Sequence, residues 1–327
     1  MKKAKLYIRI CLLIIIVLVG LCLFSQYRLV KLEKENLELT DTVNDYKKNS
    51  DENVKKTVRK YMEEGKGTTA MLRYVYDDCA VIFDTYKYIF VDVDESLRLN
   101  TLNTNNFIRE NGEVRYEVDS KTVSHKGIDV SKFQGDIDWA AVADSGVEFA
   151  MIRLGYRGYG TGEIALDEKA LTNIQGATDA GIKVGVYFFS QAITEDEAVE
   201  EAEFVLDIIK DYDVEYPVVF DTEEIYNDDG RAEDLSPEDL TKITSKFCST
   251  IKKAGYTPMI YANLRWYLLS LDMAELDKYD KWYASYENTL YFPYEIGMWQ
   301  YSEEGEVNGI TGDVDLNISF KDYSTED

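Results

Sequence analysis

Short apolar runs recur along the second part of the chain, and each is bounded by polar residues, Gly or Pro. Runs rich in β-branched and aromatic residues predict buried strands. The expected strands cover residues 127–131, 149–154, 183–190, 217–223, 257–262, 281–286, 297–301 and 314–318. Between the earlier runs, apolar positions recur at helical spacing and predict helices over 167–180, 195–210 and 236–254. Ser236 and Pro237 suit the start of the last helix, and Gly255 suits its end.

This alternation predicts an α/β fold, an irregular TIM-like (β/α) barrel of eight strands with reduced helices. Active sites of such barrels lie at the carboxyl ends of the strands. Acidic residues follow this rule: Asp129 closes the first strand, Asp221 and Glu223 the fourth, and Asp315 the last. Barrel closure would place the first and eighth strands side by side, so Asp129 and Asp315 are expected at one rim.

The fourth strand, PVVFDTE at 217–223, carries the clearest chemical signal. Side chains alternate along a strand, so Asp221 and Glu223 would face the same side with Cα atoms roughly 6.5 Å apart. Burial and the neighbouring charge would keep one carboxyl protonated, as acid/base catalysis requires. The alternative is a strand end followed by an acidic, solvated loop.

Aromatic residues recur near the same strand ends. Beside a carboxylate cluster they predict a sugar-binding groove, because aromatic faces cover the apolar faces of pyranose rings. The candidate substrate-binding residues are Tyr187, Tyr261, Tyr286 and Trp299.

Composition narrows the chemistry. The 327 residues include 61 acidic and 36 basic side chains, and the net charge of −25 argues against nucleic acid as a partner. The single histidine, His125, excludes a zinc site with several histidines, and its place between two segments favours a linker role. The four cysteines show no metal-binding spacing, and we expect Cys79 and Cys248 to be buried thiols. Carboxylates therefore remain the main catalytic candidates.

The N-terminus predicts a membrane anchor. Lys2, Lys3, Lys5 and Arg9 precede an apolar run over 10–24, and counting back to Leu6 gives about the 20 residues that cross a bilayer. The basic flank predicts a cytoplasmic N-terminus and an extracytoplasmic barrel in a single-pass protein of a bacterial cell membrane. A cleaved signal peptide is the alternative, but no convincing cleavage site follows.

Residues 27–66 predict a helical stalk, because apolar residues fall on heptad spacing and Pro is absent. Asn36 at a core position would suit a parallel homodimer through a coiled coil, and a single solvated helix is the alternative. Residues 67–124 predict a small β module with strands at 72–76, 80–83 and 86–93. Asn111-Gly112 predicts a tight hairpin between two further strands.

The barrel segment resembles a known family. GIDVSKFQG at 127–135, followed by IDW at 137–139, resembles the opening of the glycoside hydrolase family 25 lysozymes. FAMIRLGYRGYG at 149–160 and VGVYFF at 184–189 are similar to the family's second and third strands. FDTE at 220–223 fits its Asp-x-Glu signature, and GDVDLN at 312–317 its closing Val-Asp-x-Asn. The resemblance covers residues 127 to about 320 and leaves residues 1–120 outside it.

The resemblance implies an N-acetylmuramidase that cuts the β-1,4 bond from N-acetylmuramic acid to N-acetylglucosamine in peptidoglycan. Glu223 would be the general acid, and Asp221 would assist the attack of the substrate's own acetamido group. Asp129 and Asp315 would hold Glu223 protonated. The implied partner is the glycan strand of peptidoglycan, and no metal or organic cofactor is implied.

Two functions follow as alternatives: an active, membrane-tethered muramidase, and an inactive barrel that serves as a wall-binding scaffold. The presence of all four acids favours the enzyme. The expected organisation is a tail and anchor at 1–26, the stalk at 27–66, the β module at 67–124, the barrel at 125–322 and an acidic tail at 323–327.

Overall fold

The computed structural model describes residues 2–65, 67–225 and 230–325, and the chain forms two compact units that divide after Asp77. Within the first helix, the side chains of residues 2–17, 19, 41–46 and 49 are not described.

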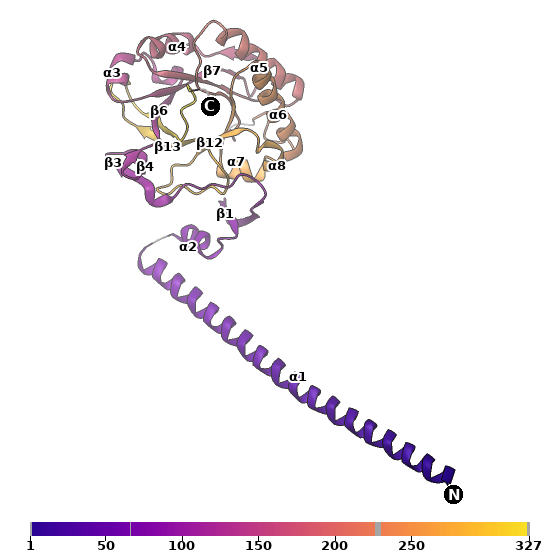
Figure 1. The fold of residues 1–327 in the computed structure, drawn as a ribbon. Helices are drawn as coiled ribbons and strands as arrows, with labels where there is room; N and C mark the ends of the chain where they lie inside the picture. The colour runs from indigo at the N-terminus through magenta and orange to yellow at the C-terminus, as the bar shows by residue number, and fades with distance from the viewer. Residues whose placement is uncertain (1, 66, 226–229, 326–327) are drawn as a thin grey trace. The chain divides into compact units, whose positions relative to one another are not determined.

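The first unit holds two helices, α1 (Lys2–Glu63) and α2 (Thr68–Val75) (Figure 1). The helix expected for the stalk is confirmed, whereas the strand expected over 72–76 is wrong because α2 covers that segment. Met71 and Val75 lie four residues apart on one helical face, and so short an apolar run fits either spacing. Leu29, Leu32 and Leu39 of the heptad pattern are exposed on α1, and their pairing with a second chain stays a prediction.

Among the residues so described, no helix is long and apolar enough to cross a membrane. Most of the predicted anchor, residues 10–17 and 19, lies outside the residues whose side chains are described. The anchor therefore stays a prediction.

Eight strands close the barrel of the second unit, in the order β6-β14-β13-β12-β11-β10-β9-β7, and β7 pairs back with β6. This confirms the eight expected strands. Their bounds are β6 (His125–Val130), β7 (Phe149–Arg157), β9 (Lys183–Phe189), β10 (Val218–Asp221), β11 (Pro258–Asn263), β12 (Asp280–Ala284), β13 (Met298–Gly305) and β14 (Val314–Ser319), with the short β8 (Ile164–Leu166) added to β7.

Strand β14 runs against both of its neighbours, whereas the other adjacent barrel strands are parallel. A parallel crossover needs about a dozen residues or more, and the connection over 306–313 is shorter than that. The chain therefore turns straight back after β13. As a result, the first residues of β14, and not its last, lie at the carboxyl rim of the barrel.

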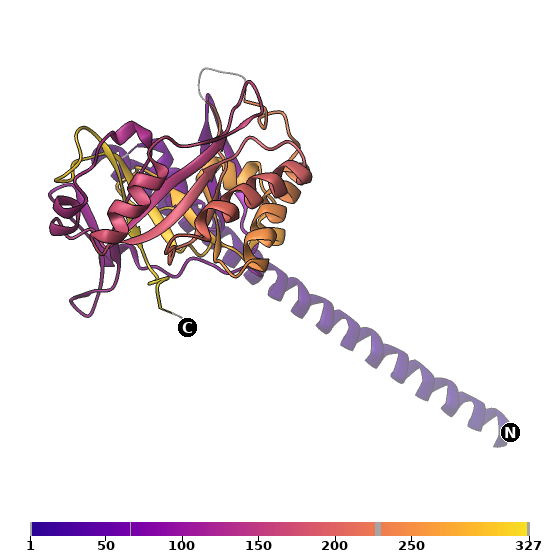
Figure 2. The same cartoon turned by 90° about the horizontal axis from the view of Figure 1, so that it is seen from above.

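Helices cover one side of the barrel: α3 (Trp139–Asp144), α4 (Ala170–Asp179), α5 (Glu195–Ile209) and α6 (Pro237–Lys253), followed by the short α7 (Leu264–Leu269) and α8 (Met273–Leu276). The three predicted helices are α4, α5 and α6. Thr194 and Ser236 cap α5 and α6 by accepting hydrogen bonds from backbone N–H groups of the first turn. Helices α5 and α6 lie side by side on the outside of the barrel (Figures 1 and 2).

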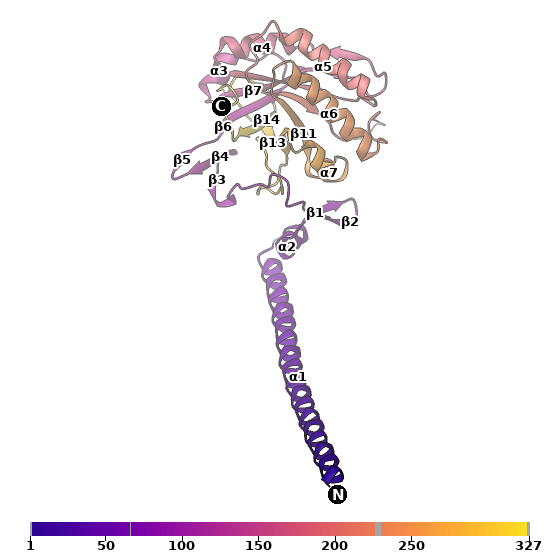
Figure 3. The same cartoon turned by 45° about the vertical axis from the view of Figure 1, so that its right-hand side comes forward.

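Residues 78–124, which we call the N-terminal arm, cover the wall that these helices leave open and reach α7 with their first hairpin (Figures 1 and 3). The arm contains β1 (Cys79–Asp84), β2 (Lys87–Asp92), the 3₁₀ turn η1 (Thr104–Asn106), β3 (Phe107–Glu110), β4 (Glu113–Val118) and β5 (Lys121–Thr122). The predicted Asn111-Gly112 hairpin joins β3 to β4, with φ of 53° and 83° at its two residues.

The arm takes the place of barrel helices that the chain lacks. Residues 285–297, between β12 and β13, contain no helix. The Phe107 ring instead packs against Trp299, with centroids 5.3 Å apart, and against Phe320 at 6.1 Å. The Asn100 backbone N–H donates to the Pro293 carbonyl at 2.9 Å. Without the arm, this part of the barrel wall would expose apolar side chains to water.

The barrel interior is packed rather than hollow at its middle level. Phe149, Met151, Val219, Trp282 and Met298 are buried there against one another. Gly127 admits the Phe149 ring, since a Cβ at this position would lie 2.1 Å from Phe149 Cζ. Between these apolar residues and the carboxyl rim, the side chains that point into the barrel become polar.

Candidate active site

Four carboxyl groups meet at the carboxyl rim of the barrel. Asp129 near the end of β6 lies opposite Asp315 in the register of β6 and β14. Asp221 is the last residue of β10 and is only 4% exposed. Glu223 is half-buried and follows β10, which ends two residues earlier than the sequence predicts. The Asp129 charge acts on the pKa values of Asp221, Glu223 and Asp315, so the four acids lie close together at this rim.

Among the four acids, Asp129 is the one whose charge the protein stabilises by several hydrogen bonds. Gln300 Nε2 and Asn317 Nδ2 each donate to its Oδ2 at 2.8 Å, and the Asp315 carboxyl is also hydrogen-bonded to it. Each amide is held in this orientation from its other end. Trp282 Nε1 donates to Asn317 Oδ1 at 2.8 Å, which leaves the NH₂ group of Asn317 for Asp129.

Gln300 is fixed in the same way by two phenols. The hydroxyls of Tyr261 and Tyr286 donate to Gln300 Oε1 at 2.8 and 3.0 Å. The NH₂ group of Gln300 therefore faces Asp129. Such an arrangement favours a negative charge on Asp129 even though the residue is buried.

The pKa values separate the roles of the acids. Burial raises the pKa of Asp129 to about 6, against the lowering effect of its hydrogen bonds. Burial and then the Asp129 charge raise the pKa of Glu223 to about 7 and that of Asp315 to about 9. Near neutral pH, Asp129 carries the negative charge, and Asp315 is protonated and donates a hydrogen bond to it. Glu223 has a pKa close to neutral pH, so it can both hold and release its proton there.

Asp221 is buried, and one of its carboxyl oxygens, Oδ1, makes no hydrogen bond to the described residues. Burial, then the charges of Glu223 and Asp129, raise its pKa well above the ordinary value, while Arg153 lowers it. An unpartnered oxygen in such a place costs free energy of folding, and a ligand N–H could satisfy it.

The side chains on both sides of Glu223 are bound by residues of α7. Trp266 Nε1 donates to Thr222 Oγ1 at 3.0 Å, and Arg265 Nη1 donates to Glu224 Oε2 at 3.3 Å. Two successive residues of one short helix thus hold the two neighbours of the predicted acid. Residues 226–229 of the same loop lie outside the described residues.

Three of the four predicted aromatic residues lie at the site. Tyr187 and Tyr261 point into the barrel and pack edge-on against Trp282, at 6.0 and 4.7 Å between centroids. Tyr286 is 47% exposed at the rim and can contact a ligand. The prediction that Trp299 binds substrate is wrong. Trp299 is 0% exposed and its ring packs against Phe107 of the arm, so it has no surface that a sugar could contact. Adjacent residues of a strand face opposite sides, and here Gln300 takes the inward position.

Gln300 and Asn317 contribute to the site but were not predicted from the sequence. Both are amides at inward positions of otherwise apolar strands, two residues from Met298 and Asp315 respectively. A polar residue in phase with the inner face of a barrel strand was the available signal.

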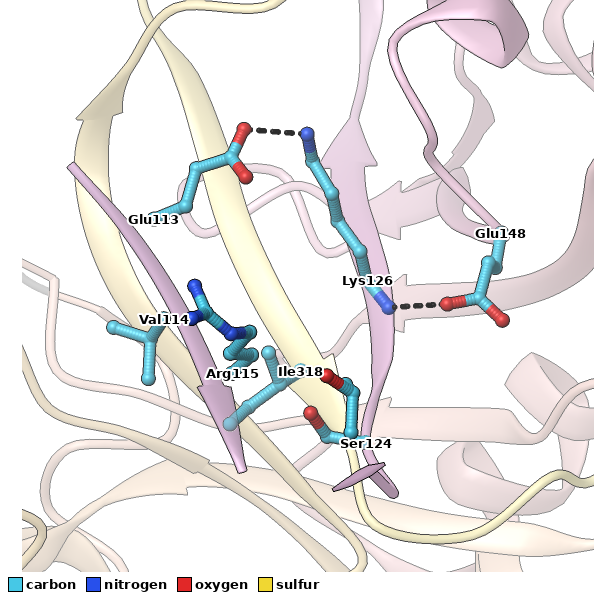
Figure 4. A pocket seen from close by; sticks show the side chains of 8 residues that line it. Glu113, Val114, Arg115, Ser124, Lys126, Glu148 and Ile318 are labelled. Carbon is cyan, nitrogen blue, oxygen red and sulfur yellow. Dashed lines mark hydrogen bonds and ion pairs between the residues drawn. The ribbon is translucent and has the colours of Figure 1, made fainter. Parts of the chain in front are cut away.

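The described residues contain no group of three or more His, Cys, Asp and Glu that could hold a metal ion. A hollow of about 150 Å³ lies away from the rim, where β4 and β5 of the arm meet β6 and β14 (Figure 4). Lys126 reaches Glu113 there, and its backbone N–H donates to Glu148. These charges are paired, and the hollow lies between the arm and the barrel.

Comparison with known proteins agrees with this geometry. The model of the glycosyl hydrolases family 25 matches residues 128–310. The chain belongs to this family. Over 203 residues it is 32% identical to the uncharacterized protein YegX of Escherichia coli K12, which covers 59% of this chain and 68% of YegX. It is 28% identical over 195 residues to the autolytic lysozyme of Clostridium acetobutylicum, covering 59% of this chain and 55% of the relative.

Among solved structures, the chain resembles the modular autolysin LytC of Streptococcus pneumoniae, determined in complex with a synthetic peptidoglycan ligand. The TM-score is 0.55 and the identity 27%, and the match covers 74% of this chain and 56% of LytC. The family 25 chain therefore spans little more than half of LytC and of the clostridial lysozyme. Its N-terminal arm precedes the segment that the family model matches.

Proposed function

We propose that this chain is a lysozyme that cuts peptidoglycan at the β-1,4 bond from N-acetylmuramic acid to N-acetylglucosamine. The observation that carries the proposal is the single-charge arrangement of the carboxyl cluster. Burial and then the Asp129 charge raise the pKa of Glu223 to about 7, so Glu223 is a carboxylic acid that can donate a proton near neutral pH. Membership of family 25 and the likeness to LytC support the substrate class.

In the proposed first step, Glu223 gives its proton to the glycosidic oxygen, which leaves as the 4-hydroxyl of N-acetylglucosamine. The acetamido oxygen of the muramic acid residue attacks its own C1 as the C1–O bond breaks. Asp221 Oδ1, which lacks a protein partner, accepts the acetamido N–H and so orients that group as positive charge spreads onto it during the attack. Water then adds to C1 as the bond between C1 and the acetamido oxygen breaks, which restores the acetamido group, and the Glu223 carboxylate takes the proton of that water.

The aromatic residues would place the sugar. Tyr286 is exposed beside Gln300, and its ring can cover the apolar face of a pyranose. Tyr187 and Tyr261 line the barrel side of the same place and limit how deep a ring can enter.

The test is mass spectrometry of the fragments that the purified full-length chain releases from peptidoglycan. The wild-type chain should give fragments with a muramic acid reducing end, and Glu223→Gln should lower the rate by roughly 10² to 10⁴ while the protein stays folded. Glu238→Gln, on the exposed start of α6, is the matched control and should leave the rate unchanged.

Reducing N-acetylglucosamine ends, or normal turnover by Glu223→Gln, would refute the assignment. A wild-type chain that binds peptidoglycan without cutting it would favour the wall-binding scaffold instead.

We also propose that the chain is held in a bacterial cell membrane by its N-terminal apolar run, with the barrel outside. The basic residues before that run support the orientation. Fractionation tests this: the full chain should pellet with membranes, resist salt washing and be cut by external protease in cells stripped of wall. A soluble form that begins near Ser25 would instead indicate a cleaved signal peptide.

A further inference from the structure

The N-terminal arm contacts the two loops that carry the acid and the exposed tyrosine of the site. One loop follows β10 and contains Glu223, and the other follows β12 and contains Tyr286. Both loops are irregular where they pass these residues, so their own backbone hydrogen bonds define their position weakly. The arm lies outside the segment that the family model matches.

The first contact runs through Arg265. Its Nε donates to Asp84 Oδ1 at 3.2 Å, and its Nη1 donates to Glu224 Oε2 at 3.3 Å. Asp84 is the last residue of β1, at the tip of the first hairpin of the arm. The guanidinium is therefore fixed on one edge by the arm and on the other by the residue next to Glu223. The arm thus helps to decide where the loop of the acid lies.

The second contact runs through Arg109 of β3. Its Nε donates to the Asn288 carbonyl at 2.9 Å, and its Nη2 donates to the Glu287 carbonyl at 3.0 Å. The guanidinium also lies over the Trp299 ring, 5.2 Å from the centroid. Two successive carbonyls directly after Tyr286 are thus bound by one planar group. Elsewhere in the same loop, the Val81 backbone N–H donates to the Tyr291 hydroxyl at 2.9 Å.

We propose that the N-terminal arm is a positioning element of this active site, with Asp84 and Arg109 as positioning residues for the acid loop and the Tyr286 loop. The inference rests on the proposed function. Asp84 acts on the site through the side chain of Arg265, and Arg109 acts through the backbone of the Tyr286 loop. The arm thereby adds to the family barrel two external supports on different parts of the rim.

The two supports predict different kinetic effects. Glu223 acts on the transition state, so a shift of its loop should lower kcat. Tyr286 is placed to hold the sugar in both ground state and transition state, so a shift of its loop should raise KM. A merely structural role would instead lower the amount of folded enzyme and leave KM unchanged.

The experiment measures kcat, KM and Tm on the full-length chain with soluble peptidoglycan fragments. Asp84→Asn should lower kcat by about fivefold at nearly constant KM, which is less than the roughly 10² that a misplacement of 1 Å can cost. Arg109→Ala should raise KM by about fivefold at nearly constant kcat. Arg109→Lys, which keeps the charge but not the paired donors, should fall between wild type and Arg109→Ala.

The matched controls lie on the same hairpins. Asp92→Asn is an exposed change on β2, and Arg115→Ala removes an arginine of β4 that pairs with Glu110 and Glu117, both within the arm. Neither control should move kcat or KM.

An inactive wild-type chain would refute the proposed function and this inference with it. An active wild type whose Asp84→Asn and Arg109→Ala variants match the two controls would overturn the role of the arm alone. So would losses of kcat that follow the folded fraction equally in every variant.

Discussion

Asp315 at the start of β14 stands directly across from Asp129 in the antiparallel register of β14 and β6. The pair shares a hydrogen bond, and the pKa of Asp315 rises to about 9 through burial and then through the Asp129 charge. Asp315 therefore supports the charge on Asp129 as a neutral donor. It does not add a second charge, so the repulsion that keeps Glu223 protonated comes chiefly from Asp129.

Asp129→Asn should move the alkaline limb of the kcat profile to lower pH. The acid must be protonated, and the Asp129 charge is one of the causes that raise the pKa of Glu223 to about 7. With that charge removed, the pKa of Glu223 falls toward its ordinary value. Each unit of the shift costs about tenfold in kcat on the alkaline side. A pH–kcat series decides this, and an unmoved limb would contradict it.

Asp221→Asn should lower kcat by about 10² to 10³ and leave substrate binding measurable, because its oxygen works on charge that develops in the transition state. Asn keeps one oxygen in a buried place, so the fold should persist. The readout is kcat beside the Kd of a glycan fragment. Unchanged turnover with weak binding would make Asp221 a sugar-positioning residue.

Gln300→Leu should damage both stability and rate. The change removes a donor to Asp129 and the shared acceptor of two tyrosine hydroxyls, and each buried group left unsatisfied costs about 1–3 kcal/mol. The pKa of Asp129 should rise, because the hydrogen bond from Gln300 lowers it. Urea unfolding and the acid limb of kcat report the two effects. Gln175→Leu on α4 is the surface control.

Arg157→Met should destabilise the barrel unit by about 3–5 kcal/mol, the usual cost of removing one partner of a buried ion pair. Arg157 Nε donates to Glu201 Oε1 at 2.7 Å, and both side chains are buried between β7 and α5. The same arginine binds the Gly162 carbonyl. Urea unfolding measures the loss. A double variant with Glu201→Leu should recover part of it, since no unpaired charge remains, and a further loss would argue against the pair.

A chain truncated to residues 121–327 should aggregate, whereas one that begins at Asp78 should fold. Removal of Phe107, Val114 and Tyr116 uncovers Trp299 and Phe320, and burial of three such side chains contributes about 5 kcal/mol or more. That loss approaches the whole stability of many domains. Light scattering and circular dichroism of the two fragments test the expectation. A well-folded 121–327 fragment would show the arm to be dispensable for folding.

The sequence predicted the eight strands because each is a short apolar run, and it predicted the acids because each stands near a strand end. It did not predict the reversed direction of β14, since residue spacing gives a strand but not its orientation. Trp299 was misplaced for a related reason. At a barrel wall covered by the arm, the outward face is as apolar as the inward one, so an aromatic residue does not reveal its side. The helix α2 was missed because a run of few residues fits two periods.

The position of β14 near the end of the chain also determines when the site can assemble. Asp129 depends on amides 171 and 188 residues further along the chain, and one of them lies in β14, which closes the ring. Ribosomes deliver the chain from its N-terminus, so the charged centre cannot assemble until almost all of it has been made. Until then, Asp129 lacks the amide donors that stabilise its charge. Under the proposed function, we therefore expect no cutting of peptidoglycan before β14 has closed the barrel.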